Sequence, residues 1–280
     1  MPTANLHDVE IYYEVHGGGE AALLVPPSWW PCDTWHVGVV PTLSQRYRTI
    51  IFDCRGTGRS GKTKTGYTVS QFAADSAALL AHLGISRCHA VGFALGGQIV
   101  QALALDRPDL VATLTIAAAG PGSKRLDGSR RDLSLETERE IHDLGFELYI
   151  RSHIDNDGMA FSPDFYHQHR EVAAALSNAL WSGQTTVEQF RYHEEARLTW
   201  DALAKAHEVK VPTLILCGAA DDVNRRGSTP VGTARRLAEL IPGAELALIP
   251  NVKHMTFWDG MGAIAALQDF LSRHPIGNGA

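Results

Sequence analysis

A glycine-rich stretch at residues 90–98 constrains the fold of this 280-residue chain more than any other part of its sequence. Residues 88–91 are apolar apart from His89 and predict a short buried strand, whereas residues 99–105 contain no Gly or Pro and predict a helix. Three glycines between them predict a sharp turn: Gly92, Gly96 and Gly97. Such a turn is typical of a nucleophile elbow, which holds one side chain on a strained backbone at the edge of a parallel sheet.

The central position of this turn is occupied by Ala94. A methyl group cannot attack a carbonyl carbon, so the chain has the scaffold of a nucleophilic enzyme without its nucleophile. Three interpretations are open at this point. The alanine is an engineered Ser-to-Ala exchange, or it belongs to a natural relative with lost or different chemistry, or the glycine-rich turn occurs by chance.

Composition narrows the class of protein. With 45% hydrophobic residues, 280 residues can form one large α/β domain with an insertion. A net charge of −6 argues against an extended nucleic-acid surface, and four scattered cysteines without C-x-x-C spacing indicate a reduced, metal-free protein. We expect a cytoplasmic protein without membrane contact, because no leader pattern and no membrane-spanning apolar run is present.

Strand and helix patterns alternate along the chain. The predicted helices cover residues 70–83, 234–241 and 263–271, and the proline-containing residues 26–35 predict a loop. The alternation predicts a doubly wound, mostly parallel α/β sheet with helices on both faces. Besides 88–91, the predicted strands cover residues 9–15, 22–25, 49–52, 112–117, 211–217 and 246–249.

The middle of the chain differs in composition from the rest. It holds most of the charged, helix-length stretches and no convincing pair of strands. We therefore predict a helical cap at residues 122–204, inserted into a core formed by residues 1–121 and 205–280. The cap histidines, His193 among them, are expected to face solvent or to line a pocket.

Four motifs in fixed order give the chain a family resemblance. They lie at residues 53–60 (DCRGTGRS), 92–97 (GFALGG), 211–221 (VPTLILCGAAD) and 250–258 (PNVKHMTFW). On these motifs the chain resembles the α/β-hydrolase fold family, in particular its cap-bearing branch of esterases, lactonases, enol-lactone hydrolases and carbon–carbon bond hydrolases. Four motifs in family order argue against a chance turn.

The resemblance implies a catalytic triad whose first member is missing. It gives position 94 the place of the nucleophile, Asp221 that of the acid and His254 that of the base. Asp222, next to Asp221, is the alternative acid, and a turn residue in solvent is the alternative role for Asp221. In such a triad the histidine takes and returns the proton of the nucleophile while the carboxylate fixes its tautomer.

The resemblance also implies an oxyanion hole of two backbone N–H groups. Leu95 is expected to supply one, and Ser28 the other, with Trp29 as the fallback. This second donor departs from the family, because Pro26 and Pro27 stand where the family has a His-Gly pair.

Four tryptophans are the candidate substrate contacts. Trp29 and Trp30 lie in the proline-rich loop, Trp181 lies in the cap, and Trp258 follows His254 by four residues. Ordinary packing is the alternative for each of them. An apolar wall of this kind predicts a medium-sized apolar or aromatic ester or lactone as substrate.

The resemblance therefore implies a serine hydrolase that cleaves an ester or lactone through an acyl-enzyme, without cofactor or metal. We favour an engineered Ser-to-Ala form, because a line that had abandoned catalysis would place glycine more comfortably at position 94. Alternatives are a natural lyase, isomerase or cofactor-free oxygenase that uses His254 and Asp221 as a general base, a ligand-binding scaffold, and a carbon–carbon bond hydrolase. A homodimer is a candidate assembly.

Overall fold

The computed structural model describes residues 2–122, 134–152, 154, 160–182, 185–221 and 230–277. Within these residues eight strands form one sheet in the order β1-β2-β4-β3-β5-β6-β7-β8. The strands are β1 Thr3–Leu6, β2 Val9–His16, β3 Ala21–Val25, β4 Arg48–Phe52, β5 Cys88–Phe93, β6 Val111–Ala117, β7 Thr213–Gly218 and β8 Glu245–Ile249.

The sheet is parallel from β4 to β8, and β1 and β2 join its edge as antiparallel strands. Every residue of β5 and of β6 is buried, as expected for central parallel strands that are covered on both faces. The predicted doubly wound, mostly parallel sheet is confirmed.

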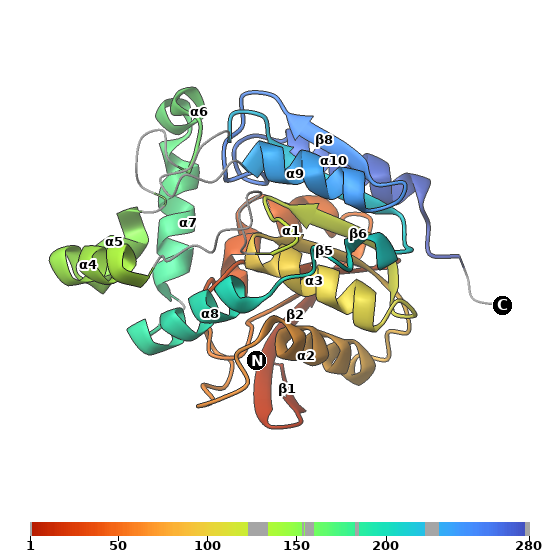
Figure 1. Ribbon diagram of the computed structural model, residues 1–280, viewed down its shortest axis with the longest axis horizontal. Helices are drawn as coiled ribbons and strands as arrows, with labels where there is room; N and C mark the ends of the chain where they lie inside the picture. The colour runs from red at the N-terminus through yellow and green to blue at the C-terminus, as the bar shows by residue number, and fades with distance from the viewer. Residues whose placement is uncertain are drawn as a thin grey trace.

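Helices cover both faces of the sheet (Figure 1). On one face pack α2 (Val69–His82), α3 (Leu95–Asp106) and α9 (Pro230–Leu240). On the other pack α1 (Val39–Leu43) and α10 (Gly262–Arg273). The two cores on either side are filled by alternate residues of each strand, because successive side chains of a strand point to opposite faces.

Among the described residues between β6 and β7, five α-helices lie beside the sheet, on the left in Figure 1. The chain leaves the core at Gly122 and returns at Asp201, and these two residues form an isolated antiparallel bridge. The division into core and cap stays a prediction, and we propose that its boundary lies at this bridge. The helices are α4 Ser134–Leu144, α5 Phe146–Ser152, α6 Pro163–Gln168, α7 Arg170–Ser182 and α8 Val187–Thr199.

Three short elements differ from the sequence prediction. Strand β1 and helix α1 were not predicted, because four or five residues give too little periodicity to recognise. The prediction of a loop up to residue 35 is wrong at its end, where a 3₁₀ helix, η1, spans Cys32–His36. Pro31 precedes this helix at the N-cap position, where its missing N–H costs no helical hydrogen bond. A second 3₁₀ helix, η2, spans Ala206–Glu208.

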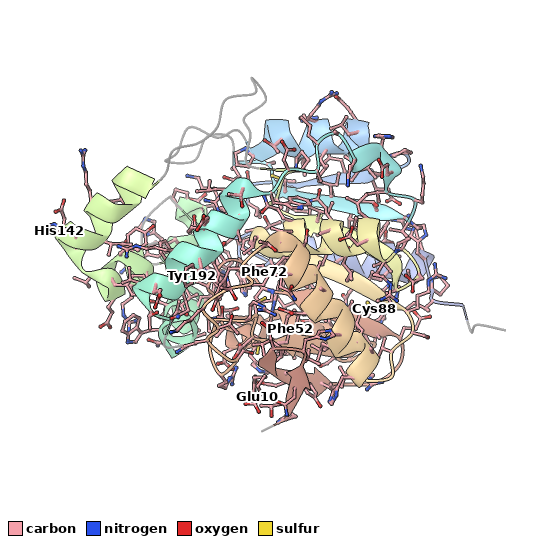
Figure 2. All side chains as sticks on the ribbon, turned by 60° about the horizontal axis from the view of Figure 1, so that its bottom comes forward. Glu10, Phe52, Phe72, Cys88, His142 and Tyr192 are labelled. Carbon is pink, nitrogen blue, oxygen red and sulfur yellow. The ribbon has the colours of Figure 1, made fainter. Side chains whose placement is uncertain are left out.

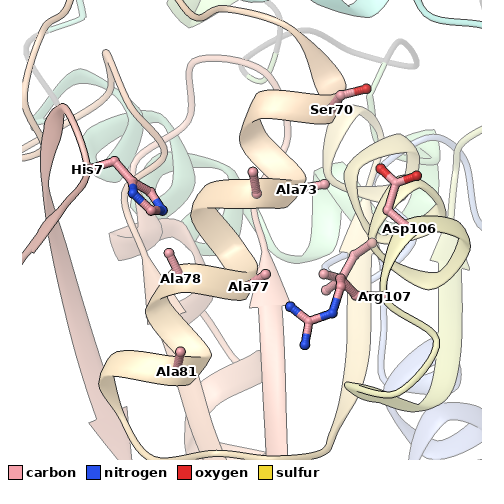
Figure 3. A pocket seen from close by; sticks show the side chains of 10 residues that line it. His7, Ser70, Ala73, Ala77, Ala78, Ala81, Asp106 and Arg107 are labelled. Atoms are coloured by element: carbon pink, nitrogen blue, oxygen red, sulfur yellow. The ribbon is translucent and has the colours of Figure 1, made fainter.

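A groove of about 360 Å³ runs along the outside of α2 and α3 (Figure 3). It is lined mainly by alanines of α2, and it reaches Asp106 and Arg107 at the C-terminal end of α3. The glycine-rich turn lies before the opposite end of α3, so this groove is separate from the predicted site. Among the described residues, no helix has both the length and the apolar character needed to cross a bilayer.

Candidate active site

Ala94 joins β5 to α3 with a backbone that non-glycine residues rarely adopt, at φ 50° and ψ −114°. Glycine is required at the flanking positions because other backbone atoms approach them too closely for a Cβ. A Cβ on Gly92 would lie 2.1 Å from the carbonyl oxygen of Gly96, and one on Gly96 would lie 2.1 Å from that of Val25. The turn is therefore packed against β3, and it holds residue 94 in a conformation that costs about 1–3 kcal/mol.

Asp221 and His254 form a hydrogen-bonded pair at the carboxyl ends of the neighbouring strands β7 and β8. His254 Nδ1 lies 2.9 Å from Asp221 Oδ2. The carboxylate is buried, whereas 31% of the histidine side chain is exposed. With Nδ1 donating to the carboxylate, Nε2 is left as the acceptor. Asp222, the alternative acid, lies outside the described residues.

The elbow and the pair are adjacent. The ring of Phe93, the residue before Ala94, lies 5.5 Å from the ring of His254. Gly218 lets the two strand ends approach, because a Cβ there would lie 2.2 Å from the carbonyl oxygen of Val252. Asp221 and His254, which follow two different strand ends, therefore lie beside the strained turn.

The loop that carries His254 is anchored by a buried carboxylate, Asp259. Asp259 Oδ2 accepts hydrogen bonds from the backbone N–H of Lys253 at 2.9 Å and of Ser162 at 2.8 Å. The Ser162 hydroxyl donates to Oδ1 at 2.8 Å. Ser162 precedes α6, so Asp259 ties the histidine loop to the inserted helices. Asp259 directly follows the last of the four motifs and was not among the predicted site residues.

The two backbone N–H groups predicted as oxyanion donors belong to Leu95 and Ser28. Leu95 is the first residue of α3, where an N–H has no partner within the helix. Ser28 lies in the turn in which the Trp30 N–H donates to Pro27. The fallback donor is already used, because the Trp29 N–H donates to His193 Nδ1 at 3.1 Å.

His193 of α8 is a buried connector, and its predicted place in solvent or on a pocket wall is wrong. Its Nδ1 accepts from Trp29, and its Nε2 donates to the carbonyl oxygen of Arg55 at 2.9 Å. Thr185 holds the other side of the same residue, donating to the Trp29 carbonyl oxygen at 3.0 Å. Trp29 itself has φ 54°. Burial lowers the pKa of His193 to about 4, so the ring is neutral at physiological pH.

Three of the four candidate tryptophans are buried around the elbow. Trp30 and Trp258 lie 6.2 and 5.1 Å from the Phe93 ring, and Trp258 stacks on Trp35 at 5.2 Å. Trp29 packs on Phe190 of α8. The fourth, Trp181 of α7, is half-buried under the guanidinium of Arg151 at 5.9 Å. Aromatic rings therefore gather around Phe93, the residue before Ala94.

Most of this chain matches a known protein family and its members. A family model described as the alpha/beta hydrolase fold matches residues 15–261. The provisionally named carbamate hydrolase RutD of Azorhizobium caulinodans is 30% identical over 253 residues, which is 88% of this chain and 89% of that protein.

Solved structures give the same architecture. The enol-lactonase of Burkholderia xenovorans LB400 superposes with a TM-score of 0.81 at 21% identity, over 97% of this chain and 100% of that one. A thermophilic esterase of Thermogutta terrifontis gives 0.81 at 20% identity, over 98% and 99%. At these identities the two structures establish the fold alone.

Proposed function

Because this chain belongs to the alpha/beta hydrolase fold family, we propose that its site is built to hydrolyse carboxylic esters or lactones, with Ala94 in the place of the nucleophile. The observation that carries this proposal is the His254–Asp221 pair, bonded at 2.9 Å beside the elbow. A carboxylate-oriented imidazole next to a strained strand-to-helix turn is the arrangement that activates a hydroxyl for acyl transfer.

The backbone at position 94 supports a serine as its missing partner. A glycine would remove most of the strain of φ 50°, yet the chain carries a residue with a Cβ there. Serine differs from alanine by one oxygen, so it would occupy the same backbone. We therefore propose that Ala94 is a Ser-to-Ala exchange that keeps the elbow and removes its reaction.

With a serine at position 94, the reaction would proceed in two steps. His254 Nε2 takes the hydroxyl proton as the oxygen attacks the carbonyl carbon, while Asp221 stabilises the imidazolium. The N–H groups of Leu95 and Ser28 bind the negative oxygen of the tetrahedral intermediate. His254 then passes its proton to the leaving alkoxide. Water repeats the sequence on the acyl-enzyme and releases the acid.

The aromatic surroundings support an apolar substrate. We propose that Trp29, Trp30 and Trp181 line the approach to residue 94, with Trp258 behind them, and that the substrate is a medium-sized, apolar or aromatic ester or lactone. The relative named for carbamate hydrolysis extends the class to be tested, because a carbamate presents the same kind of carbonyl carbon to a nucleophile.

The test is the reversion Ala94→Ser, assayed on p-nitrophenyl esters, lactones and a phenyl carbamate. We expect turnover at least about 10³-fold above the parent chain, since removal of a triad member costs that much or more. The double variant Ala94→Ser/His254→Ala is the matched control and should return to the parent level. A folded revertant that turns over none of these substrates would contradict the proposal.

A second candidate function rests on the same pair in the chain as it stands. Asp221 and His254 need no serine to act as a general base on a water molecule or on an acidic C–H of a bound substrate. This alternative predicts activity in the Ala94 chain that disappears in His254→Ala. The proposed hydrolase predicts such activity only after Ala94→Ser, so one set of variants separates the two.

A further inference from the structure

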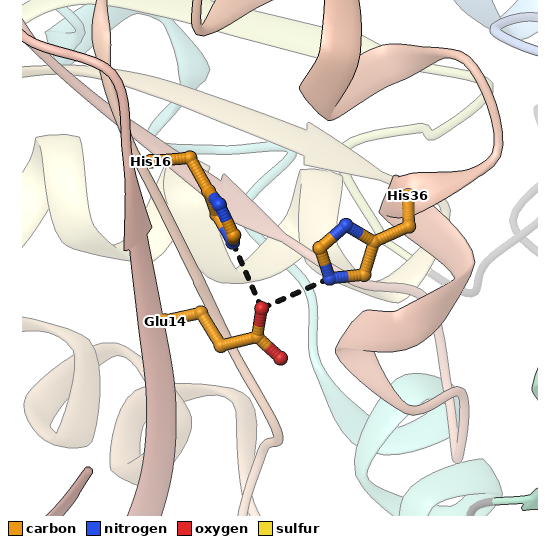
Figure 4. A group of neighbouring side chains, drawn as sticks. All are labelled: Glu14, His16 and His36. Carbon is orange, nitrogen blue, oxygen red and sulfur yellow. Dashed lines mark hydrogen bonds and ion pairs between the residues drawn. The ribbon is translucent and has the colours of Figure 1, made fainter. Parts of the chain in front are cut away.

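A second group of chemically active side chains lies on β2 and η1, apart from the elbow (Figure 4). Glu14 and His16 are two residues apart on β2 and share one face of the sheet, and His36 ends η1. Glu14 Oε2 lies 2.8 Å from His16 Nε2 and 2.9 Å from His36 Nε2. All three potential ligand atoms lie within 4.8 Å of one another.

We propose that Glu14, His16 and His36 bind a divalent transition-metal ion, with Zn²⁺ as the best match. Two imidazole nitrogens and one carboxylate oxygen are donors that zinc prefers, and three protein ligands leave a fourth position for water. Bonds of 2.0–2.1 Å in a tetrahedral site place ligand atoms about 3.3 Å apart. The present separations from Oε2 need to open by only a few tenths of an ångström.

Binding would exchange protons for the ion. In the metal-free arrangement each Nε2–H can donate to Oε2 of Glu14. A ligating imidazole must present a bare Nε2, so its proton moves to Nδ1 or is released to solvent.

The charges around the group favour a cation. Glu14 Oε1 accepts a hydrogen bond from the Tyr12 hydroxyl at 2.8 Å, which fixes the plane of the carboxylate. Arg59 opposes a cation, with Nη1 3.8 Å from Oε1, but it also pairs with Asp33 and Asp53 at 3.1 and 3.0 Å. Three carboxylates around one guanidinium leave a net negative surrounding.

The group of Glu14, His16 and His36 is accessible to solvent, and an ion bound there would connect two elements of the fold. The side chains of His16 and His36 are 32% and 38% exposed, so an ion can enter from solvent. All four cysteines are buried and would not compete for the ion in the folded protein. An ion here would fix the position of η1 relative to β2. The carbonyl oxygen of Thr34 in η1 accepts a hydrogen bond from Trp258 Nε1 at 3.3 Å. We infer a structural role for the ion, independent of the proposed hydrolysis.

The experiment is titration of Zn²⁺ into tag-free, metal-stripped protein by isothermal titration calorimetry, with equilibrium dialysis for the stoichiometry. We expect one ion per chain, and a rise in Tm of about 5 °C at free Zn²⁺ 100-fold above Kd. Tyr12→Phe keeps all three ligands and should weaken binding about 10-fold. His16→Gln and His36→Gln each remove a ligand and should weaken it further.

His142→Gln is the matched control, because His142 is an exposed histidine of α4 (Figure 2), and α4 lies apart from β2 in Figure 1. It should bind like the parent. Circular dichroism and Tm in EDTA verify that each variant folds, and Glu14→Gln replaces any histidine variant that does not. Unchanged affinity in the ligand variants would place the ion elsewhere and overturn the proposal. A parent Kd weaker than about 1 mM would also overturn it.

Discussion

Replacing His193 by glutamine should change how the stability of the protein depends on pH. The ring is fully buried and its pKa is lowered to about 4 by that burial. A glutamine at this position can still accept from the Trp29 N–H through Oε1 and donate to the Arg55 carbonyl through Nε2, but it cannot bind a proton near neutral pH. The substitution therefore removes the titration while keeping most of the contacts.

The sign and size of the effect follow from linkage. In the unfolded chain His193 titrates near its ordinary pKa of about 6.5, so between that value and about 4 the unfolded state binds more protons than the folded state. The contribution is complete above about pH 6.5 and is lost as the pH falls toward 4. At about 1.4 kcal/mol per pH unit, the parent chain loses about 3 kcal/mol over this window.

Urea unfolding at closely spaced pH values between 4 and 8 measures this loss. His89 is also buried, and burial lowers its pKa, so the curve of the parent chain alone cannot be assigned to His193. The difference between the parent chain and His193→Gln isolates the one ring. We expect the parent chain to be more stable by about 1–2 kcal/mol at pH 7 and to lose that advantage near pH 5.

His142→Gln is the control for this experiment, because His142 is 87% exposed, and its curve should run parallel to that of the parent chain. Parallel curves for His193→Gln would refute the reasoning. In that case the folded protein would hold His193 as easily protonated as the unfolded chain does, and the ring would not be the buried neutral acceptor of the Trp29 N–H.

Two further substitutions test the elbow and the histidine loop. Ala94→Gly should leave the free energy of unfolding unchanged or raise it by up to about 2 kcal/mol, because it releases the strain at φ 50°. The control is Ala74→Gly, on the exposed side of α2, which should lower the free energy of unfolding by about 1 kcal/mol. If urea unfolding shows the same loss for Ala94→Gly as for Ala74→Gly, the backbone at residue 94 is not strained. Asp259→Ala should cost about 2–4 kcal/mol, since it leaves the Lys253 and Ser162 donors without their acceptor, and a loss below 0.5 kcal/mol would contradict this.

The elements with a strong hydrophobic periodicity, or with glycines that mark their ends, could be predicted from the sequence. Strand β5, the turn at Ala94 and helix α3 were predicted because apolar runs and glycines bracket them over a few residues. The start of α3 was set too late, because Gly96 and Gly97 were assigned to the turn. These glycines lie in the first helical turn, where close contact with β3 and with Ala119 excludes larger residues.

Motif order predicted that Asp221 and His254 lie close together, whereas the long-range contacts around the candidate site could not be predicted. His193 meets Trp29 across 164 residues, and Asp259 meets Ser162 across 97. Local periodicity carries no information about such pairings. For the group on β2 one signal was present, because Glu14 and His16 share a strand face, but His36 joins them only through the turn into η1.

These long-range contacts converge on one property of the molecule, which is that the inserted helices hold both halves of the candidate site. From α8 and the residue before its N-cap, His193 and Thr185 bind the backbone of Trp29, the neighbour of the candidate oxyanion donor Ser28. From the segment before α6, Ser162 binds the carboxylate that anchors the loop of His254. Displacement of these helices would break buried hydrogen bonds on both sides at once, at about 1–3 kcal/mol for each group left unpaired. On the proposed assignment of roles, the inserted helices cannot move far without also disturbing the proposed base His254 and the proposed oxyanion donor Ser28, so substrate selection and catalytic geometry would be coupled through the same packing.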